Sequence, residues 1–523
     1  MADFDESKSD ATEPEIQPDW MPAGCTKLAD GEYDAIVLGT GLKECVMSGL
    51  LSTNGLKVLH LDRYNYYGAE CASLNLTNLY EKFQAGEPDK YLGANRDFNV
   101  DLIPKFIMAC GNLTKVLLHT KVTKYLEFKS VDGSFVTTKE GKVLKVPATP
   151  DEAVRSSLMG MFEKRRFRNF LIYISKYDEK NPATWKDLDL KKMTMKEVSW
   201  SLTPTQHQRQ RQRHTKPPHS HSPTLQLYVH WGLVEDTHKF ISHAMCLEVT
   251  DDHLNQPALE TVMNLQCYCY SLERYGKSPY IYPMYGLGGL PEGFSRLCAI
   301  HGGTFMLNRD VDEVLFDEEG AAWGIKCGTE CAKATMVIGD PSYFPKEKST
   351  STGKIVRSIC FLNHPIPNTN NSESCQIIIP GVNVGRKNDI FVCMVSSAHN
   401  VAAKGIFTAI VSTKVETSNP GNEIIPGLQL LGPILKRFDS VVETYKPNDD
   451  GLSDRCFISE SFDSLSHFEK GERAKRSEAK RASTFTNLNK LFNFPLNLLR
   501  TFRCGRHVKP VRESHWNHIG HEH

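Results

Sequence analysis

The hydrophobic pattern early in the chain predicts one strand–helix–strand unit. The apolar run from Tyr33 to Leu38 is short, rich in β-branched residues and followed by glycine, which is typical of a buried parallel strand. Helix-like sequence then extends to about Asn54, and a second strand is expected from Lys57 to Leu61. We therefore expect a βαβ unit at the centre of an α/β fold.

Later segments predict more helices and strands around this unit. We expect helices from Lys105 towards His119 and from Leu290 to His301, the latter with Phe294, Leu297 and Ile300 facing inward. A small antiparallel region is predicted over 121–146, and the strand 334–338 should return to the first sheet. Further strands are predicted at 303–307, 311–316, 324–327, 377–379, 390–395 and 407–412.

From Pro150 the pattern becomes helical. Thr149 and Pro150 have the residue types of an N-cap and a first helical position. Apolar residues at helical spacing continue to Ile174, with a basic cluster between them, and helices are also expected over 231–249 and 268–275. The pattern predicts a small helical bundle and leaves open whether its apolar faces form an ordinary core or a site for an apolar ligand.

Three segments lack apolar periodicity, and they complete the predicted domain organisation. Residues 1–31 are predicted to be a disordered acidic tail, and 201–223, rich in Gln, Arg, His and Pro, a disordered insertion. Residues 470–523 carry twelve Lys or Arg against four Glu and form a divergent basic tail, either unstructured or in contact with membranes. We expect a discontinuous large α/β domain over 32–146 and 276–469, and a small helical domain over 147–275.

The loop between the first two predicted strands resembles a dinucleotide-binding turn with one defect. Gly39, Gly41 and the later acid Asp62 stand where such a motif needs them, but Glu44 replaces the third glycine. Two like charges ~4 Å apart at an effective dielectric of ~20 repel by ~4 kcal/mol. We infer that the loop is vestigial and binds no nucleotide. The alternative is that Glu44 points to solvent and flavin still binds.

Composition and local sequence argue against several classes of function. The formal net charge is zero, so no global field recruits nucleic acid or an anionic membrane. The 15 cysteines contain no pair with zinc-ligand spacing, and we expect reduced thiols, no metal site and a cytoplasmic protein. The acidic N-terminus does not resemble a signal peptide, and no apolar run reaches the ~20 residues that span a bilayer.

Two aromatic segments are candidate contact surfaces. Tyr64, Tyr66 and Tyr67 follow the second predicted strand and should form a partly exposed ledge. The segment from Arg274 to Gly289 alternates aromatics, glycines and prolines, which favours an exposed binding loop over a core strand.

Taken together, these motifs resemble the Rab GDP-dissociation inhibitor family, the sister of the Rab escort proteins. The resemblance covers about residues 32 to 469, apart from the insertion. It is carried by residues 34–42, 65–68, 99–106, 157–168, 274–288, 374–380 and 398–403.

The resemblance implies a fold and a binding function without catalysis. It implies a flavin-monooxygenase-like large domain without flavin, combining a nucleotide-binding-type parallel sheet with mixed β structure, and a smaller all-helical domain. The large domain would hold a GDP-bound Rab GTPase, and the helical domain would shelter its geranylgeranyl tail. The protein would then cycle between cytoplasm and membranes. Within the helical domain, the expected lipid pocket is formed by Phe170, Ile174, Phe240, Ala244 and Leu247.

The same resemblance assigns candidate site residues. Tyr67, Arg296, Thr304 and Met306 match the Rab-binding platform, and Arg96 is a weaker match. Arg274 and Tyr280 match a mobile loop that engages the membrane or a recycling factor.

One platform position and one motif glycine depart from the family pattern. Gly289 stands where the family has glutamate, and Ala69 replaces a second glycine. Losing that carboxylate removes ~1–3 kcal/mol of binding if the contact is buried. The alternatives left open are a Rab escort protein, a flavin-dependent oxidoreductase and a paralogue that binds Rab weakly.

Overall fold

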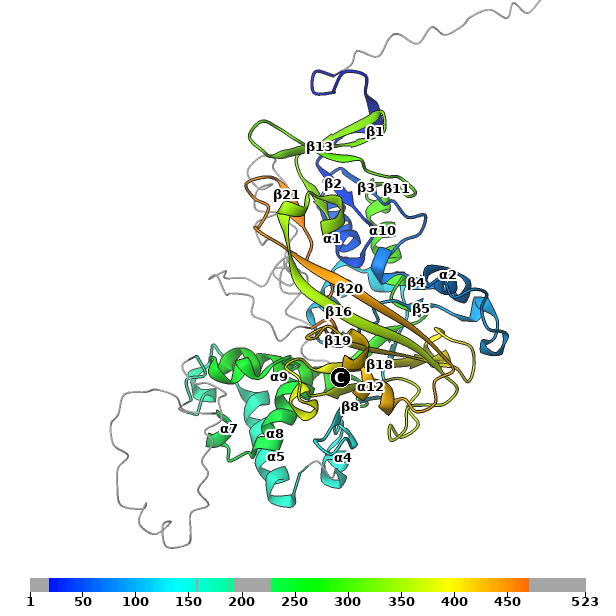
Figure 1. Ribbon diagram of the computed structural model, residues 1–523. Coiled ribbons are helices and arrows are strands. Elements are labelled where there is room, and N and C mark those ends of the chain that lie inside the picture. The colour runs from blue at the N-terminus through cyan, green and yellow to red at the C-terminus, as the bar shows by residue number, and fades with distance from the viewer. Residues whose placement is uncertain (1–17, 157–158, 187, 192–226, 470–523) are drawn as a thin grey trace, which may run out of the picture.

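The computed structural model describes residues 18–156, 159–186, 188–191 and 227–469. The predicted βαβ unit is confirmed. It consists of β2 (Ala35–Leu38), α1 (Leu42–Thr53) and β3 (Val58–Leu61), and the two strands pair in parallel. Figure 1 shows this unit in the upper half of the molecule, the long antiparallel strands across the middle and the helical region below them.

The βαβ unit belongs to a fully parallel five-stranded sheet in the order β11-β3-β2-β15-β21. The prediction that a late strand returns here is confirmed, since Val337 of β15 pairs with Ile36. The added strands of this sheet are β11 (Thr304–Met306), β15 (Val337–Gly339) and β21 (Cys456–Ile458).

A larger, mostly antiparallel sheet has the order β20-β16-β19-β18-β17-β8-β9, with β17 and β8 as its parallel pair. Within the antiparallel region predicted over 121–146, β8 and β9 pair in antiparallel orientation, as expected. Its strands are β8 (Gly133–Thr137), β9 (Val143–Lys145), β16 (Ser349–Leu362), β17 (Cys375–Ile379), β18 (Ile390–Ser396), β19 (Phe407–Lys414) and β20 (Lys436–Pro447).

Three smaller sheets complete the β structure. The first contains β1 (Thr26–Tyr33), β14 (Glu330–Ala334), β13 (Ala322–Cys327) and β12 (Glu313–Phe316). The second contains β6 (Ile107–Met108), β10 (Tyr280–Pro283) and β7 (Phe128–Ser130). The third pairs β4 (Ser73–Leu74) with β5 (Val100–Asp101).

Between Pro150 and Tyr275, the described residues form helices and no strands. The predicted N-cap is confirmed, because the Thr149 side chain accepts a hydrogen bond from the Glu152 amide. Among the described residues, the α-helices and the one π-helix are α1, α2 (Leu76–Lys82), α3 (Asn112–Thr120), α4 (Pro150–Arg155), α5 (Met161–Lys176), α7 (Leu227–His230), α8 (Glu235–Lys239), the π-helix η6 (Phe240–Met245), α9 (Ala258–Tyr275), α10 (Gly289–Ile300), α11 (Pro420–Glu423) and α12 (Ile425–Leu430).

Four local predictions were wrong. Residues 26–31 are not part of a disordered tail, because β1 pairs in parallel with β14 and buries Leu28. The helix expected from Lys105 begins only after Gly111, following the short strand β6. The helix expected over 231–249 is broken into α8 and η6 after a turn at Gly232. Ile300 is not inward but 60% exposed on α10.

The segment after α9 also differs from its prediction. Tyr280–Pro283 is the buried central strand β10 and not an exposed loop, since its aromatic rings pack in the core beside Phe106. The predicted disorder of 1–17, of the insertion 201–223 and of the tail 470–523 concerns segments outside the described residues.

Candidate functional site

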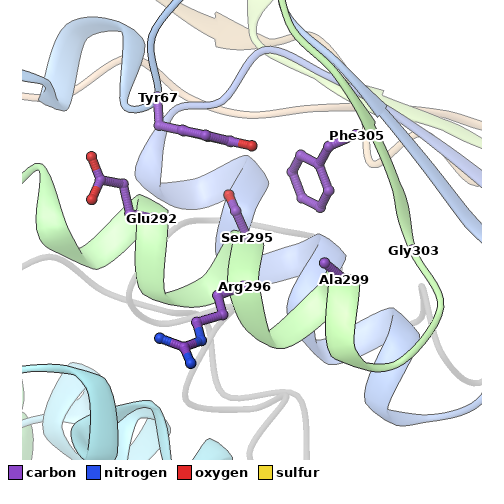
Figure 2. Close-up of a pocket in the computed structure, with 7 residues that line it drawn as sticks. All are labelled: Tyr67, Glu292, Ser295, Arg296, Ala299, Gly303 and Phe305. Atoms are coloured by element: carbon purple, nitrogen blue, oxygen red, sulfur yellow. The ribbon is translucent and has the colours of Figure 1, made fainter.

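A surface pocket of about 420 Å³ lies where α10 approaches β11 and the turn after β3. Figure 2 shows Tyr67 and Phe305 above the exposed face of α10. The lining residues are Tyr67, Glu292, Ser295, Arg296, Ala299, Gly303 and Phe305.

Packing of α10 on α1 determines which of its side chains reach this pocket. Leu290, Phe294 and Leu297 recur at helical spacing and are buried. Gly49 allows the two helices to approach closely, because a Cβ there would lie 3.2 Å from Phe294 Cδ1. The opposite face of α10 therefore presents Glu292 and Arg296 to the surface.

Tyr67 is held over the pocket by a tight turn. Gly68 has φ of 103°, and a Cβ at this residue would lie 2.9 Å from the Ala72 backbone. The next residue, Ala69, has φ of 46°, a left-handed conformation that is unfavourable for alanine and accepted readily by glycine. The Tyr67 ring meets Phe305 edge-on with centroids 6.0 Å apart, and partial burial raises the Tyr67 pKa.

The pocket rim carries two opposite charges that are directed apart. The Arg296 guanidinium stacks on the Tyr125 ring at 4.7 Å, and Figure 2 shows it pointing away from Glu292. Glu292 remains exposed, but the surrounding side chains reduce its hydration and raise its pKa. Both groups are therefore available to a partner that carries complementary charges.

Only part of the predicted platform meets at this pocket. Tyr67 and Arg296 line it together. Thr304 and Met306 flank Phe305 on β11, so by strand alternation their side chains lie on its other face. Arg96 lies on a separate 3₁₀ turn, Asn95–Asp97, where its side chain is 90% exposed.

Sequence reasoning missed Glu292 as a site residue. The available signal was its position one helical turn before Arg296, on the same face of a predicted helix. Gly289 lies at the start of α10, and a Cβ there would lie 3.1 Å from Leu126 Cδ2. Because that atom is the end of a flexible side chain, a larger residue could enter with a small shift.

Side chains of the protein occupy the predicted nucleotide-binding loop through internal contacts. The carboxylate of Asp62, the expected ribose ligand, accepts hydrogen bonds from the Thr40 amide and hydroxyl, both at 2.5 Å, and from the Tyr64 amide. Glu44 does not point to solvent; it is 4% exposed, and its carboxylate covers Gly41. Burial, with a smaller contribution from Asp340, raises the Glu44 pKa to about 7. These residues do not fit a flavin dinucleotide.

The five residues of the predicted lipid pocket lie in one continuous hydrophobic core. Phe170, Ile174, Phe240, Ala244 and Leu247 are each at most 6% exposed. Phe240 and Ala244 belong to the π-helix η6. A lipid could enter between these side chains only if the helices move apart, so this role stays a prediction.

The two residues of the predicted mobile loop occupy different environments. Arg274 is exposed in the last turn of α9. Tyr280 is fully buried, and its hydroxyl accepts a hydrogen bond from Gln376 Nε2 at 3.3 Å. A direct contact between the Tyr280 ring and a membrane would need this strand to open.

The described ranges contain neither a candidate metal cluster nor a helix that could span a membrane. No cluster of three or more His, Cys, Asp or Glu side chains there could hold a metal ion. Within the same ranges, no helix has both the length and the apolar character needed to traverse a bilayer.

Comparisons with known proteins place the chain in one family. The family model described as GDP dissociation inhibitor matches residues 29–215 and 206–475. The chain is 50% identical over 441 residues to the probable secretory pathway GDP dissociation inhibitor 1 of Schizosaccharomyces pombe, covering 84% of this chain and 93% of that protein. It is 49% identical over 447 residues to the Rab GDP-dissociation inhibitor of Saccharomyces cerevisiae, covering 84% and 92%.

A solved structure agrees with these sequence matches. The crystal structure of the Rab GDI of Plasmodium falciparum superposes with a TM-score of 0.76 at 45% identity, covering 84% of this chain and 95% of that chain. The resemblance predicted from the motifs is thus confirmed. The chain belongs to the GDP dissociation inhibitor family.

Proposed function

We propose that this protein binds prenylated Rab GTPases in their GDP-bound state, blocks GDP release and shields the geranylgeranyl tail. It thereby carries Rab between membrane and cytosol. The observation that carries this proposal is 49% identity to a protein named Rab GDP-dissociation inhibitor over 92% of that protein's length. Such an inhibitor acts by binding alone and needs no catalytic group.

The pocket on α10 supplies the docking surface in this proposal. Tyr67 and Phe305 offer partly buried aromatic area, and Arg296 and Glu292 offer charges of both signs at its rim. Aromatic and arginine side chains around a well-packed centre are typical of residues that dominate binding energy. We assign Arg96, Thr304 and Met306 to the surrounding contact area.

The helical region supplies the lipid shelter. A twenty-carbon tail gains roughly 0.8 kcal/mol for each CH₂ that it removes from water. The core around Phe170 and Phe240 would have to open to receive it. The π-helix η6 is a suitable place for such movement, because π-helical turns are uncommon and are frequently found at functional sites.

Two of the three alternatives, the escort protein and the flavin-dependent oxidoreductase, are less well supported. Relatives matched over more than nine-tenths of their length carry the name of inhibitors and not of escort proteins. A flavin-dependent oxidoreductase would need the loop that Glu44 and Asp62 already occupy with internal contacts.

Extraction of prenylated Rab from liposomes tests the proposal. We expect the purified protein to release GDP-loaded Rab into solution and to leave GTP-loaded Rab on the vesicles. Arg296→Ala should weaken extraction, whereas Lys346→Ala, which removes an exposed cation elsewhere, should not. A folded wild-type sample that extracts neither form would contradict the proposal. If Gly289→Glu then restored extraction, the defect would lie in the platform and not in the lipid shelter.

A further inference from the structure

An exposed corner of the helical region combines protruding apolar side chains with unpaired cations. Met161 and Phe162 in the first turn of α5 are 82% and 79% exposed, and Val154 near the end of α4 is 73% exposed. These exposures are the three highest among the large apolar side chains of the described residues. We name these residues, with Arg165 and Arg168, the α4–α5 corner.

The corner is held in shape by internal contacts. Lys164 Nζ donates to the Val154 carbonyl at 2.6 Å, which ties the end of α4 to the start of α5. Arg166 Nη1 lies 3.2 Å from Glu163 Oε2 and donates to the Gly232 carbonyl, while the other carboxylate oxygen of Glu163 accepts from the Val234 amide. Two of the basic side chains therefore stabilise the corner itself.

The remaining cations give the corner a local positive charge. Arg165 and Arg168 are exposed and form no ion pair with any residue that the structure describes. Residues 154–168 contain five Lys or Arg and one Glu, although the whole chain has no net charge. The only carboxylate in this stretch, Glu163, is buried and neutralised by Arg166.

We propose that the α4–α5 corner is a docking surface for an anionic lipid bilayer. Phe162 and Met161 would enter the boundary between headgroups and acyl chains, and Arg165 and Arg168 would contact lipid phosphates. The apolar residues protrude instead of lining a groove, and such a shape suits a fluid interface better than a preformed protein pocket. The surrounding positive charge complements anionic headgroups.

The position of the corner fits the membrane step of the proposed function, on which this inference builds. Figure 1 shows α4 and α5 at the lower end of the molecule and α1 with α10 in the upper half. A GTPase bound at the α10 pocket would therefore leave the corner free to contact the membrane that holds its lipid tail.

Flotation of the full-length protein with vesicles tests this inference without any GTPase. We expect binding to phosphatidylcholine vesicles that contain 30% phosphatidylserine, weaker binding at raised salt and little binding to phosphatidylcholine alone. Arg165→Glu with Arg168→Glu should lower the bound-to-free ratio about tenfold or more. Phe162→Ser should lower the bound-to-free ratio several-fold on each of the two lipid compositions for which wild-type binding can be measured.

Matched variants separate the corner from general charge and from other segments. Lys333→Glu with Lys346→Glu makes the same charge change at exposed positions elsewhere, and Val441→Ser removes another exposed apolar side chain. Neither should reduce binding by more than about twofold. The proposal is overturned if the corner variants float as well as wild type, an outcome that would assign membrane contact to another segment.

GDP-loaded Rab binding in solution distinguishes this inference from the proposed function. The corner variants should bind unprenylated, GDP-loaded Rab as wild type does, because Phe162 and Arg165 lie outside the α10 pocket. Loss of vesicle binding with intact Rab binding supports the corner. If the wild-type protein does not bind Rab, the proposed function is contradicted. The vesicle flotation result then still decides whether the α4–α5 corner binds membranes.

Discussion

Packing around a side chain can shift its pKa, and Glu44 shows this most directly in this protein. Its ordinary pKa of 4.5 rises to about 7 because the carboxyl is buried beside Asp340. One carboxyl oxygen, Oε1, has no hydrogen-bond partner among the described residues. Glu44, which stands at the position of the motif's third glycine, thus occupies the space near Gly41. Its carboxyl group stays protonated up to about pH 7.

This shift predicts how stability changes with pH. The folded protein retains the Glu44 proton up to about pH 7, whereas the unfolded chain releases it near pH 4.5. The contribution of Glu44 to stability is therefore lost as pH rises between these values, by about 3 kcal/mol at ~1.4 kcal/mol per unit. Glu44→Gln should become more stable relative to wild type from pH 5 to 8, as measured by urea unfolding.

The exposed substitution Glu87→Gln serves as the control, because its side chain lies in solvent. It should leave the pH dependence of the wild-type unfolding free energy unchanged. An unchanged slope in Glu44→Gln as well would show that Glu44 titrates near its ordinary pKa in the folded state.

Glu292 is the residue on which platform binding can be tested most sharply. Partial desolvation already raises its pKa, so a cationic or hydroxyl group of a bound GTPase would find a carboxylate with reduced hydration. We expect Glu292→Gln to weaken binding of GDP-loaded Rab by about tenfold, which corresponds to ~1.4 kcal/mol. Isothermal calorimetry measures this change, with Glu318→Gln on the exposed β12–β13 turn as the matched control. Equal affinities for the two variants would remove Glu292 from the platform.

Elements are joined across the molecule by a buried ion pair between η6 and the large sheet. His243 Nδ1 lies 2.7 Å from Asp389 Oδ2, just before β18, and His243 Nε2 lies 3.4 Å from Asp251 Oδ1. Burial opposes the charged imidazolium, but the two carboxylates outweigh it and raise the His243 pKa to about 10. The helical region is thus attached to the sheet by a charge that persists at neutral pH.

Breaking this pair should be costly. Asp389→Asn leaves a buried imidazolium with one weaker partner, and we expect a loss of about 3–5 kcal/mol in the free energy of unfolding. The folded pKa lies above the ordinary value of 6.5, so the stabilisation is complete below pH 6.5 and is lost as pH rises through about 10.

His243→Gln should therefore reduce the fall in melting temperature that wild type shows between pH 7 and 10. His301→Gln changes an exposed histidine and should preserve the wild-type slope. If the melting temperatures of wild type, His243→Gln and His301→Gln fall equally between pH 7 and 10, His243 is not charged in the folded protein.

At the scale of the whole molecule, local patterns predicted some elements and long-range pairing determined others. The βαβ unit was predictable because its strands are adjacent in sequence and buried on both faces. Strand β1 was not, because its polar residues are ordered by pairing with Glu330–Ala334 some 300 residues later. Strand β10 contains the tyrosines and proline of a loop, and only its central position between β6 and β7 makes it core. Glu292 was missed because its place at the pocket depends on how α10 packs.

One hydrophobic core joins the parallel sheet to the helical region. It contains Val37 of β2, Val46 of α1 and Phe170 of α5. Regions that share a continuous core lose the same contacts when either one unfolds, so we expect the parallel sheet and the helices to unfold together. Scanning calorimetry should show one transition, even though the sequence predicts two domains.

Phe170→Ala tests this coupling because it removes a fully buried ring from the helical side of the core. Such a truncation costs about 3–5 kcal/mol. We expect the whole transition to move to lower temperature, with hydrogen exchange rising in α1 as well as in α5. Met263→Ala, which truncates a 40% exposed side chain on α9, should shift the transition much less. A new low-temperature transition with exchange confined to the helices would show that the helical region opens independently, and a helical region that opens without disturbing the α10 pocket would then be the better description of this molecule.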